Sequence, residues 1–229
     1  MTAAAITLLV AAMMDGKGTV AQRNDACYAL RGQRSVEVVD ALRGALADKT
    51  VRACAARDLR EAGAVDVLTE VLSGSDADAG MAAARELAEL RDPRALEALG
   101  RAALSENVLL ASSAIYALGG YEANAGLPFL LRVAGQPTVS GVTALEQAAR
   151  SRDAAVVALA RRLLEKGDVA AQVIALGIIA DLGDAGDLPR LRELAAHSDP
   201  VYARGRGFGF MPPIDVARAA QTAIERLTQ

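Results

Sequence analysis

Aromatic residues are scarce in this sequence of 229 residues, which contains four tyrosines, three phenylalanines and no tryptophan. Because 52% of the residues are nevertheless hydrophobic, the apolar content is mainly alanine, leucine and valine. Small side chains suit helices that pack closely together, whereas sheets are richer in aromatic and β-branched residues. The composition therefore favours an all-α fold.

A basic excess is absent as well. The 25 lysines and arginines are outnumbered by 28 aspartates and glutamates, which gives a net charge of −3 and an isoelectric point near 5.3. Proteins that bind a phosphate backbone generally carry a strongly basic surface. We therefore expect no nucleic-acid partner.

Residues that bind metals or act as nucleophiles are few. His197 is the single histidine, and the two cysteines, Cys27 and Cys54, match no metal-binding spacing. No Ser–His–Asp arrangement is recognisable, so we expect no catalytic residue, metal or cofactor. We expect His197 to be exposed or to cap a helix. Carboxylates at one helix junction are explained by caps and turns, namely Asp181, Asp184 and Asp187.

The almost uninterrupted apolar run from Ala3 to Met14 is too short to span a bilayer. It is similar to the core of a signal peptide, and Val10-Ala11-Ala12 could serve as a cleavage site. However, no lysine or arginine precedes the run. We therefore interpret it as the first helix of the fold and expect a cytoplasmic protein, with export left open by this apolar segment.

An internal period of about thirty residues runs through the sequence. Six landmarks, each opening an apolar segment, are separated by intervals of 29, 31, 31, 29 and 32 residues. They are Val36, Val65, Leu96, Leu127, Val156 and Leu188. Such regularity is the sequence signature of a repeat protein.

Each period is predicted to contain two helices. In the segment DPRALEALGRAAL, Leu96, Leu99 and Leu104 recur at helical spacing. Glycines and Asp-Pro steps separate the helices, and no stretch alternates as a half-buried strand would. A lone helix pair cannot bury its apolar face, so six to seven antiparallel pairs are expected to stack into an α-solenoid. In the second period, Val51 reaches Leu59 after eight residues instead of ten, which predicts a shorter or shifted helix.

The repeated phrase, an aspartate and a valine followed by Ala-x-Ala-Leu-Gly, resembles the bacterial HEAT-like repeats, which also occur in phycobilin lyases. Residues 1 to about 200 fit, and Asp215 to Leu227 resume the pattern, with Asp215 as the predicted N-cap. The resemblance implies a right-handed, armadillo-type superhelix in a single domain, residues 1–229. In this register, Cys27 and Cys54 are buried small residues on neighbouring helices, so a disulfide is possible in an oxidising compartment.

The segment ARGRGFGFMPP, residues 203–213, belongs to an insertion at about 200–214 in the last repeat. Insertions in solenoids emerge as loops, often on a binding face. Two interpretations are open. The loop covers the end of the stack with its aromatic rings, or it contacts a partner through cationic and apolar groups. The candidate partner-binding residues are Arg204, Arg206, Phe208 and Phe210.

Three consecutive second helices carry arginine five residues after their landmark, at Arg101, Arg132 and Arg161. We call these residues the arginine ladder, because neighbouring helices in a stack lie roughly 10 Å apart. The resemblance implies that second helices line the concave face, and arginine suits recognition of carboxylates and phosphates. The alternative is a solvated face, with pairing to Glu97 and Glu165 within the helices.

The resemblance covers enzymes as well as binding proteins. Deoxyhypusine hydroxylases hold iron through His–Glu pairs, which a chain with one histidine does not reproduce. HEAT-like DNA glycosylases use aromatic and basic residues around a flipped base, and a bilin pocket also needs aromatics, so the composition favours neither. We therefore expect a non-catalytic scaffold that holds a protein or peptide, with acidic character, on the concave face. A lyase- or hydrolase-like enzyme with an unrecognised site is the alternative.

Overall fold

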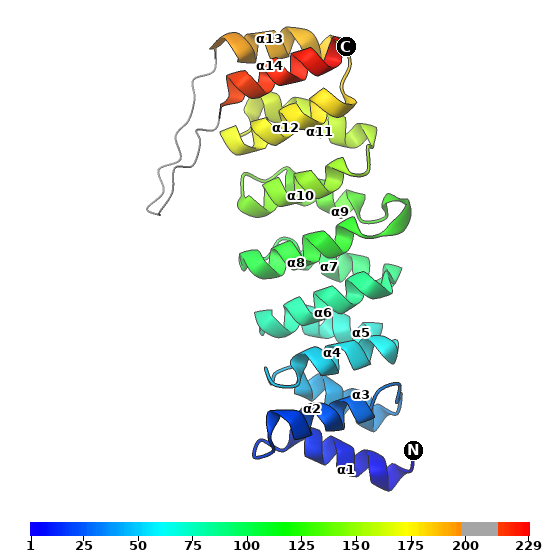
Figure 1. The fold of residues 1–229 in the computed structure, drawn as a ribbon. Coiled ribbons are helices and arrows are strands. Elements are labelled where there is room, and N and C mark those ends of the chain that lie inside the picture. The colour runs from blue at the N-terminus through cyan, green and yellow to red at the C-terminus, as the bar shows by residue number, and fades with distance from the viewer. Residues whose placement is uncertain (198–214) are drawn as a thin grey trace. The chain divides into compact units, whose positions relative to one another are not determined.

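The computed structural model describes residues 1–197 and 215–229. Within these ranges the chain forms fourteen α-helices, three 3₁₀ turns and no β-strand (Figure 1), which confirms the predicted all-α class. No helix in these ranges has both the length and the apolar character that crossing a bilayer requires. The elements are α1 (Ala3–Met14), α2 (Val20–Ala29), α3 (Val36–Ala45), α4 (Arg52–Glu61), α5 (Val65–Leu72), α6 (Ala77–Leu90), η1 (Pro93–Ala95), α7 (Leu96–Ala102), α8 (Val108–Gly119), η2 (Glu122–Asn124), α9 (Leu127–Ala134), α10 (Val139–Ala149), α11 (Ala154–Lys166), α12 (Val169–Leu182), η3 (Ala185–Asp187), α13 (Leu188–His197) and α14 (Val216–Leu227).

The helices follow the predicted period. The odd-numbered helices from α3 onward are the predicted second helices, and five of these six begin at the landmark residue itself. The exception, α11, begins at Ala154, two residues before Val156. The apolar run Ala3–Met14 forms α1, as predicted.

Polar N-caps explain where the even-numbered helices start. In six of these seven helices the preceding side chain accepts a hydrogen bond from a backbone N–H of the first turn, which satisfies a donor that the helix leaves unpaired. These caps are Thr19, Asp76, Asn107, Thr138, Asp168 and Asp215. Helix α4 differs, because the side chain of Val51 offers no acceptor; its ten residues equal those of α2 and are fewer than the fourteen of α6. The second repeat therefore differs from the others in its N-cap, and the shorter or shifted helix expected from the sequence stays a prediction.

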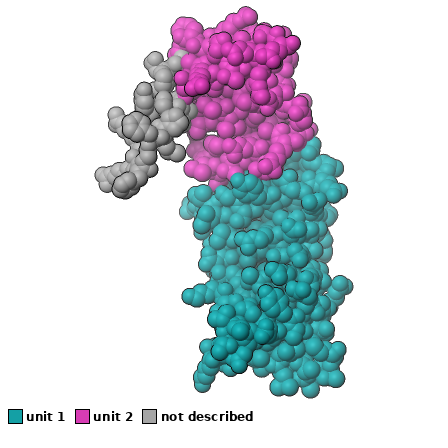
Figure 2. All heavy atoms as spheres, viewed as in Figure 1, with its two compact units in different colours: residues 1–129 teal, residues 130–229 magenta. Residues whose placement is uncertain are grey.

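The chain divides into two compact units, residues 1–129 and 130–229 (Figure 2). In the first unit, α2, α4, α6 and α8 pack in sequence against one another, and α5 lies against both α4 and α6. In the second unit, α10, α12 and α14 pack in sequence, with α11 and α13 against them. The prediction of a single domain over residues 1–229 stays a prediction.

Small and branched aliphatic side chains fill the core of each unit. Ala83 and Ala84 of α6 are fully buried, as are the larger Leu59 and Leu87 in the same unit and Leu145 in the second unit. Burial of one leucine contributes roughly 2 kcal/mol. The prediction of closely packed helices with few aromatics in the core agrees with these residues.

Ion pairs join neighbouring repeats within each unit. In the first unit, Arg43 Nη2 lies 2.8 Å from Glu70 Oε1, and Arg60 Nη1 lies 3.1 Å from Glu86 Oε2. In the second unit, Arg161 pairs with a carboxylate of the next repeat at 2.7 Å. Each of these pairs spans about one repeat in sequence, so they fasten adjacent helix pairs to each other.

Candidate functional site

A hollow of about 410 Å³ lies between α4 and α6 on the first unit. Ala53 and Ala56 of α4 and Ala82 of α6 line it, and their short side chains leave the space between the two helices open. The charged residues of the lining are Lys49, Arg52, Arg57, Asp78, Arg85 and Glu86. We call this hollow the α4–α6 groove.

The groove carries a local positive excess, because four of its charged side chains are basic and two are acidic. This balance is opposite to that of the whole chain, whose net charge is −3. A cleft with charges of one sign concentrates the field and attracts ligands of the other sign. The groove is therefore suited to an anionic group.

One of the four groove cations, Arg52, is already bonded to other residues of the chain. Arg52 Nε donates to the carbonyl of Leu46 at 2.7 Å, and Arg52 Nη1 donates to Asp78 Oδ2 at 3.2 Å. These bonds tie the start of α4 to the preceding turn and to α6, in place of the missing N-cap. Arg52 therefore has a structural role.

The other three cations are available to a ligand. The side chains of Lys49, Arg57 and Arg85 form no hydrogen bond or ion pair with any residue in the described ranges. Lys49 and Arg85 are exposed, and Arg57 is half-buried. These three side chains are the groove cations that can bind an anionic partner without breaking a hydrogen bond or an ion pair of the described residues.

The negative charge of Glu86 in the groove is balanced mainly by Arg60. Burial raises the pKa of Glu86, and the nearby guanidinium of Arg60 opposes this effect. Glu86 Oε2 is buried and accepts no aligned hydrogen bond, although Arg60 Nη1 lies 3.1 Å away. Arg60, which gives the largest opposing effect, is not part of the groove lining, and the groove residues Arg57 and Arg85 add smaller effects that also lower the pKa of Glu86.

The second unit contains a smaller hollow of about 300 Å³ between α10 and α12. Its lining includes the apolar side chains Val173 and Ile178, and its charged residues are one arginine and two acids. One of the acids, Asp181, is paired with Arg226 at 2.6 Å. This hollow lacks the positive excess of the α4–α6 groove, so it is the weaker candidate for an anionic ligand.

Two members of the arginine ladder are paired. Arg101 Nη1 lies 3.6 Å from Glu97 Oε1 on the same helix, as the alternative interpretation expected. Arg161 bonds to Asp187 and Asp184 in the next repeat instead of Glu165: its Nε lies 2.7 Å from Asp187 Oδ1. The hydrogen bonds between Arg161 and Asp187 raise the pKa of the guanidinium and lower that of the carboxyl. Arg161 therefore stabilises the fold.

The remaining predicted site residues are not tested by the structure. Arg132 is exposed on α9. Because Arg101 belongs to the first unit and the other two ladder residues to the second, one continuous ladder surface stays a prediction. The loop residues Arg204, Arg206, Phe208 and Phe210 lie outside the described residues.

Cys27 of α2 and Cys54 of α4 form a disulfide, with their Cα atoms 6.3 Å apart. Both are buried within helices, as predicted.

Sequence reasoning missed the fully buried Asp58, one turn after Cys54 on the same face of α4. Burial raises the pKa of Asp58 to about 6, and the nearby Arg31 opposes the effect. The available signal was the Cys-x-x-x-Asp spacing, which places both side chains on one helix face.

Two of the three carboxylates that were assigned to caps and turns take those roles, whereas Asp181 lies in the last turn of α12 and pairs with Arg226. Asp184 accepts a hydrogen bond from the backbone N–H of Gly186 and caps η3, and Asp187 Oδ2 accepts one from the N–H of Asp184. His197 is exposed at the end of α13, where its Nδ1 lies 3.1 Å from the carbonyl oxygen of Glu193. None of these contacts assembles a nucleophile, base and acid.

Comparison with known proteins identifies the repeats. The family model of HEAT repeats matches residues 65–150, which confirms the identification of HEAT-like repeats in this part of the chain. No curated protein matches the sequence.

Several solved structures are similar to this chain, including the following three. The complex of CpcE and CpcF of phycocyanin lyase from Nostoc sp. PCC7120 shares 21% identity, over 97% of this chain and 94% of that chain, with a TM-score of 0.43. Human deoxyhypusine hydroxylase in complex with glycerol shares 12% identity, over 97% and 96%, with a TM-score of 0.42. An engineered protein shares 20% identity, over 97% and 96%, with a TM-score of 0.34.

Proposed function

We propose that this chain is a non-catalytic scaffold that holds a protein or peptide partner, with an acidic segment of the partner seated in the α4–α6 groove. The observation that carries the proposal is the set of three unpaired cations, Lys49, Arg57 and Arg85, around a hollow of about 410 Å³. On a chain of net charge −3, such a set marks a local site for anions.

The groove fits a short acidic segment better than a single small anion. Exposed ion pairs contribute only about 0–1 kcal/mol each, so useful affinity requires several carboxylates bound together. Arg57 and Arg85 are on neighbouring helices, and Lys49 precedes α4, so the three cations present a spread of charge. Arginine can bind each carboxylate through two parallel hydrogen bonds.

The arginine ladder is the second surface to consider for the partner. Its members Arg101 and Arg161 already pair with carboxylates of the chain. A partner would have to displace these carboxylates, whereas the groove cations need no such exchange. This difference favours the groove.

The test measures binding of a fluorescently labelled oligoglutamate peptide to the full chain by fluorescence anisotropy. The groove variant carries Lys49→Glu, Arg57→Glu and Arg85→Glu, and leaves the structural Arg52 in place. A matched variant with the same net charge carries Lys17→Glu, Arg162→Glu and Lys166→Glu, at exposed side chains outside the groove. We expect the groove variant to lose at least about tenfold in affinity, as the loss of three weak pairs implies.

Two results would contradict the assignment. Equal loss in both variants would show attraction by net charge alone. Loss in a variant carrying Arg101→Glu and Arg132→Glu, with full binding by the groove variant, would move the site to the ladder. Circular dichroism and thermal unfolding establish that each variant is folded.

A further inference from the structure

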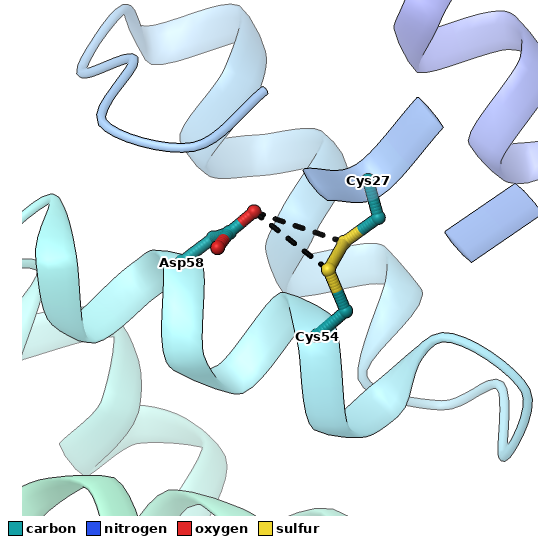
Figure 3. A group of neighbouring side chains, drawn as sticks. All are labelled: Cys27, Cys54 and Asp58. Carbon is teal, nitrogen blue, oxygen red and sulfur yellow. Dashed lines mark hydrogen bonds between the residues drawn. A yellow bond between two sulfur atoms is a disulfide. The ribbon is translucent and has the colours of Figure 1, made fainter. Parts of the chain in front are cut away.

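Three ligand-type side chains converge in the interior of the first unit, away from the groove lining. Asp58 Oδ2 lies 3.8 Å from Cys27 Sγ and 3.8 Å from Cys54 Sγ. Figure 3 shows how the three side chains point toward one another. All three residues are buried, and the ligand atoms lie within 4.8 Å of one another. The arrangement depends on the packing of α2 against α4, which brings Cys27 to the helix face that carries the other two.

The buried carboxylate of Asp58 is short of hydrogen-bond partners. Its Oδ1 accepts no hydrogen bond, and the guanidinium Nε of Arg31 lies 3.8 Å away, beyond hydrogen-bond distance. A disulfide carries no hydrogen, so its sulfurs cannot donate to Oδ2. A buried carboxylate generally requires a paired charge, a hydrogen bond or a metal ion.

We propose that the reduced form of this chain binds one thiophilic divalent ion, Zn²⁺ in a cell, through Cys27 Sγ, Cys54 Sγ and Asp58 Oδ2. Reduction precedes binding. A dithiol reductant transfers two electrons and two protons to the disulfide, gives two cysteine thiols, and is itself oxidised to a disulfide. The ion then displaces the two thiol protons to solvent and binds the thiolates.

The distances fit a four-coordinate zinc site. With Zn–S bonds of about 2.3 Å and Zn–O bonds of about 2.0 Å, a tetrahedral ion separates sulfur from oxygen by about 3.5 Å and sulfur from sulfur by about 3.8 Å. Both sulfur–oxygen separations in the structure, 3.8 Å, are already close to this value. Only the two sulfurs must move apart, which cleavage of their bond permits. A water molecule would complete the four ligands.

The charges and the donor types select the ion. Two thiolates and one carboxylate carry three negative charges, of which a divalent cation neutralises two and the nearby Arg31 offsets the third. Thiolate sulfur favours Zn²⁺, Cd²⁺ or Co²⁺ over Mg²⁺ and Ca²⁺, which prefer oxygen ligands. The site is therefore expected to discriminate strongly against the alkaline-earth ions.

The test titrates Co²⁺ into the full chain, reduced with a phosphine under argon. One equivalent is expected to give thiolate-to-cobalt charge-transfer absorption and the intense visible bands of a four-coordinate ion, which Zn²⁺ then abolishes. The oxidised chain is expected to give neither. Asp58→Asn is expected to weaken Co²⁺ binding at least about tenfold while both thiols still react with a thiol reagent.

The matched control is Asp25→Asn, at an exposed carboxylate on α2 that belongs to none of these contacts. It should bind Co²⁺ as the unmodified chain does. Absence of the charge-transfer band in the reduced unmodified chain would overturn the proposal. So would equal affinity of the Asp58→Asn and Asp25→Asn variants, because it would exclude Asp58 as a ligand. Binding by the oxidised chain would exclude the thiolates.

Discussion

The guanidinium of Arg161 is bound by two carboxylates that follow α12 in the sequence. Asp187 receives two hydrogen bonds from it, at 2.7 and 3.0 Å, and Asp184 receives one at 2.9 Å. From the sequence alone, Glu165 is the nearest partner, because it lies one helical turn away. The two-point bond to the buried Asp187 is stronger than a single exposed contact within a helix. Local spacing cannot reveal it, because the partners are about one repeat apart.

Replacement Asp187→Asn should lower the unfolding free energy by about 1 kcal/mol near pH 7, because it removes the charge from this bond. Arg161 lowers the pKa of Asp187 in the folded chain. The carboxylate therefore stabilises the fold above its unfolded pKa of about 4 and loses this effect as the pH falls through the lower folded pKa. Urea unfolding of both proteins between pH 7 and pH 2 measures the difference, which should shrink at the acid end.

The control for this measurement is Glu165→Gln, which changes the exposed carboxylate on the same helix. It should leave stability within about 0.5 kcal/mol of the native value. A larger effect from Glu165→Gln than from Asp187→Asn would contradict the pairing in the structure.

The starts of the second helices could be predicted to within two residues, because their causes are local. A capping side chain lies directly before most of the even-numbered helices, as at Thr19 and Asn107, and a change in apolar periodicity lies near the start of the second helices. The α4–α6 groove was not predicted, because it depends on which alanines of two helices face each other across a repeat. The same is true of Asp58 and the two cysteines, which meet only after α2 packs on α4.

Glycines in two helices of the second unit should respond in opposite ways to alanine. A Cβ at Gly141, in the first turn of α10, would collide with the carbonyl oxygen of Gln136, whereas a Cβ at Gly177 in α12 would meet open space. Gly141→Ala should therefore destabilise the chain by about 1–3 kcal/mol. Gly177→Ala should stabilise it by about 0.5–1 kcal/mol, because alanine is the better helix former. Thermal unfolding measures both, and a stabilising Gly141→Ala would refute the packing at α10.

Helix α4 is fastened at its start by a covalent bond. It is the even-numbered helix whose N-cap makes no side-chain hydrogen bond, and Cys54 lies in its first turn. The disulfide joins this turn to α2, and Arg52 joins it to the preceding backbone. These two contacts hold one wall of the groove in the absence of the usual cap.

For the molecule as a whole, reduction of the disulfide should weaken one region selectively. The bridge closes a loop between residues 27 positions apart, and loss of such a closure costs about 3–4 kcal/mol. Because each repeat contacts mainly its neighbours, hydrogen exchange without added metal should accelerate in α2 to α4 and stay unchanged in α12. Uniform acceleration over the described helices would contradict this view.

The period of about thirty residues was sufficient to predict the all-α class but not the two compact units. The first unit ends at residue 129, and the spacing of the landmarks is nearly the same before and after this residue. The repeat pattern indicates which residues face the interior of each helix pair. It carries no information on how strongly consecutive pairs contact one another, which depends on side-chain volumes at each interface.

The ion pairs between adjacent repeats also bear on how quickly the chain acquires its structure. Arg43 with Glu70 and Arg161 with Asp187 each close a loop of about one repeat, and the helix contacts have the same short range. Loop closure of this size costs little entropy, and proteins dominated by such near-neighbour contacts fold rapidly. Folding can therefore nucleate in more than one repeat and spread to the next, so that a slow repeat delays its neighbours without blocking the rest.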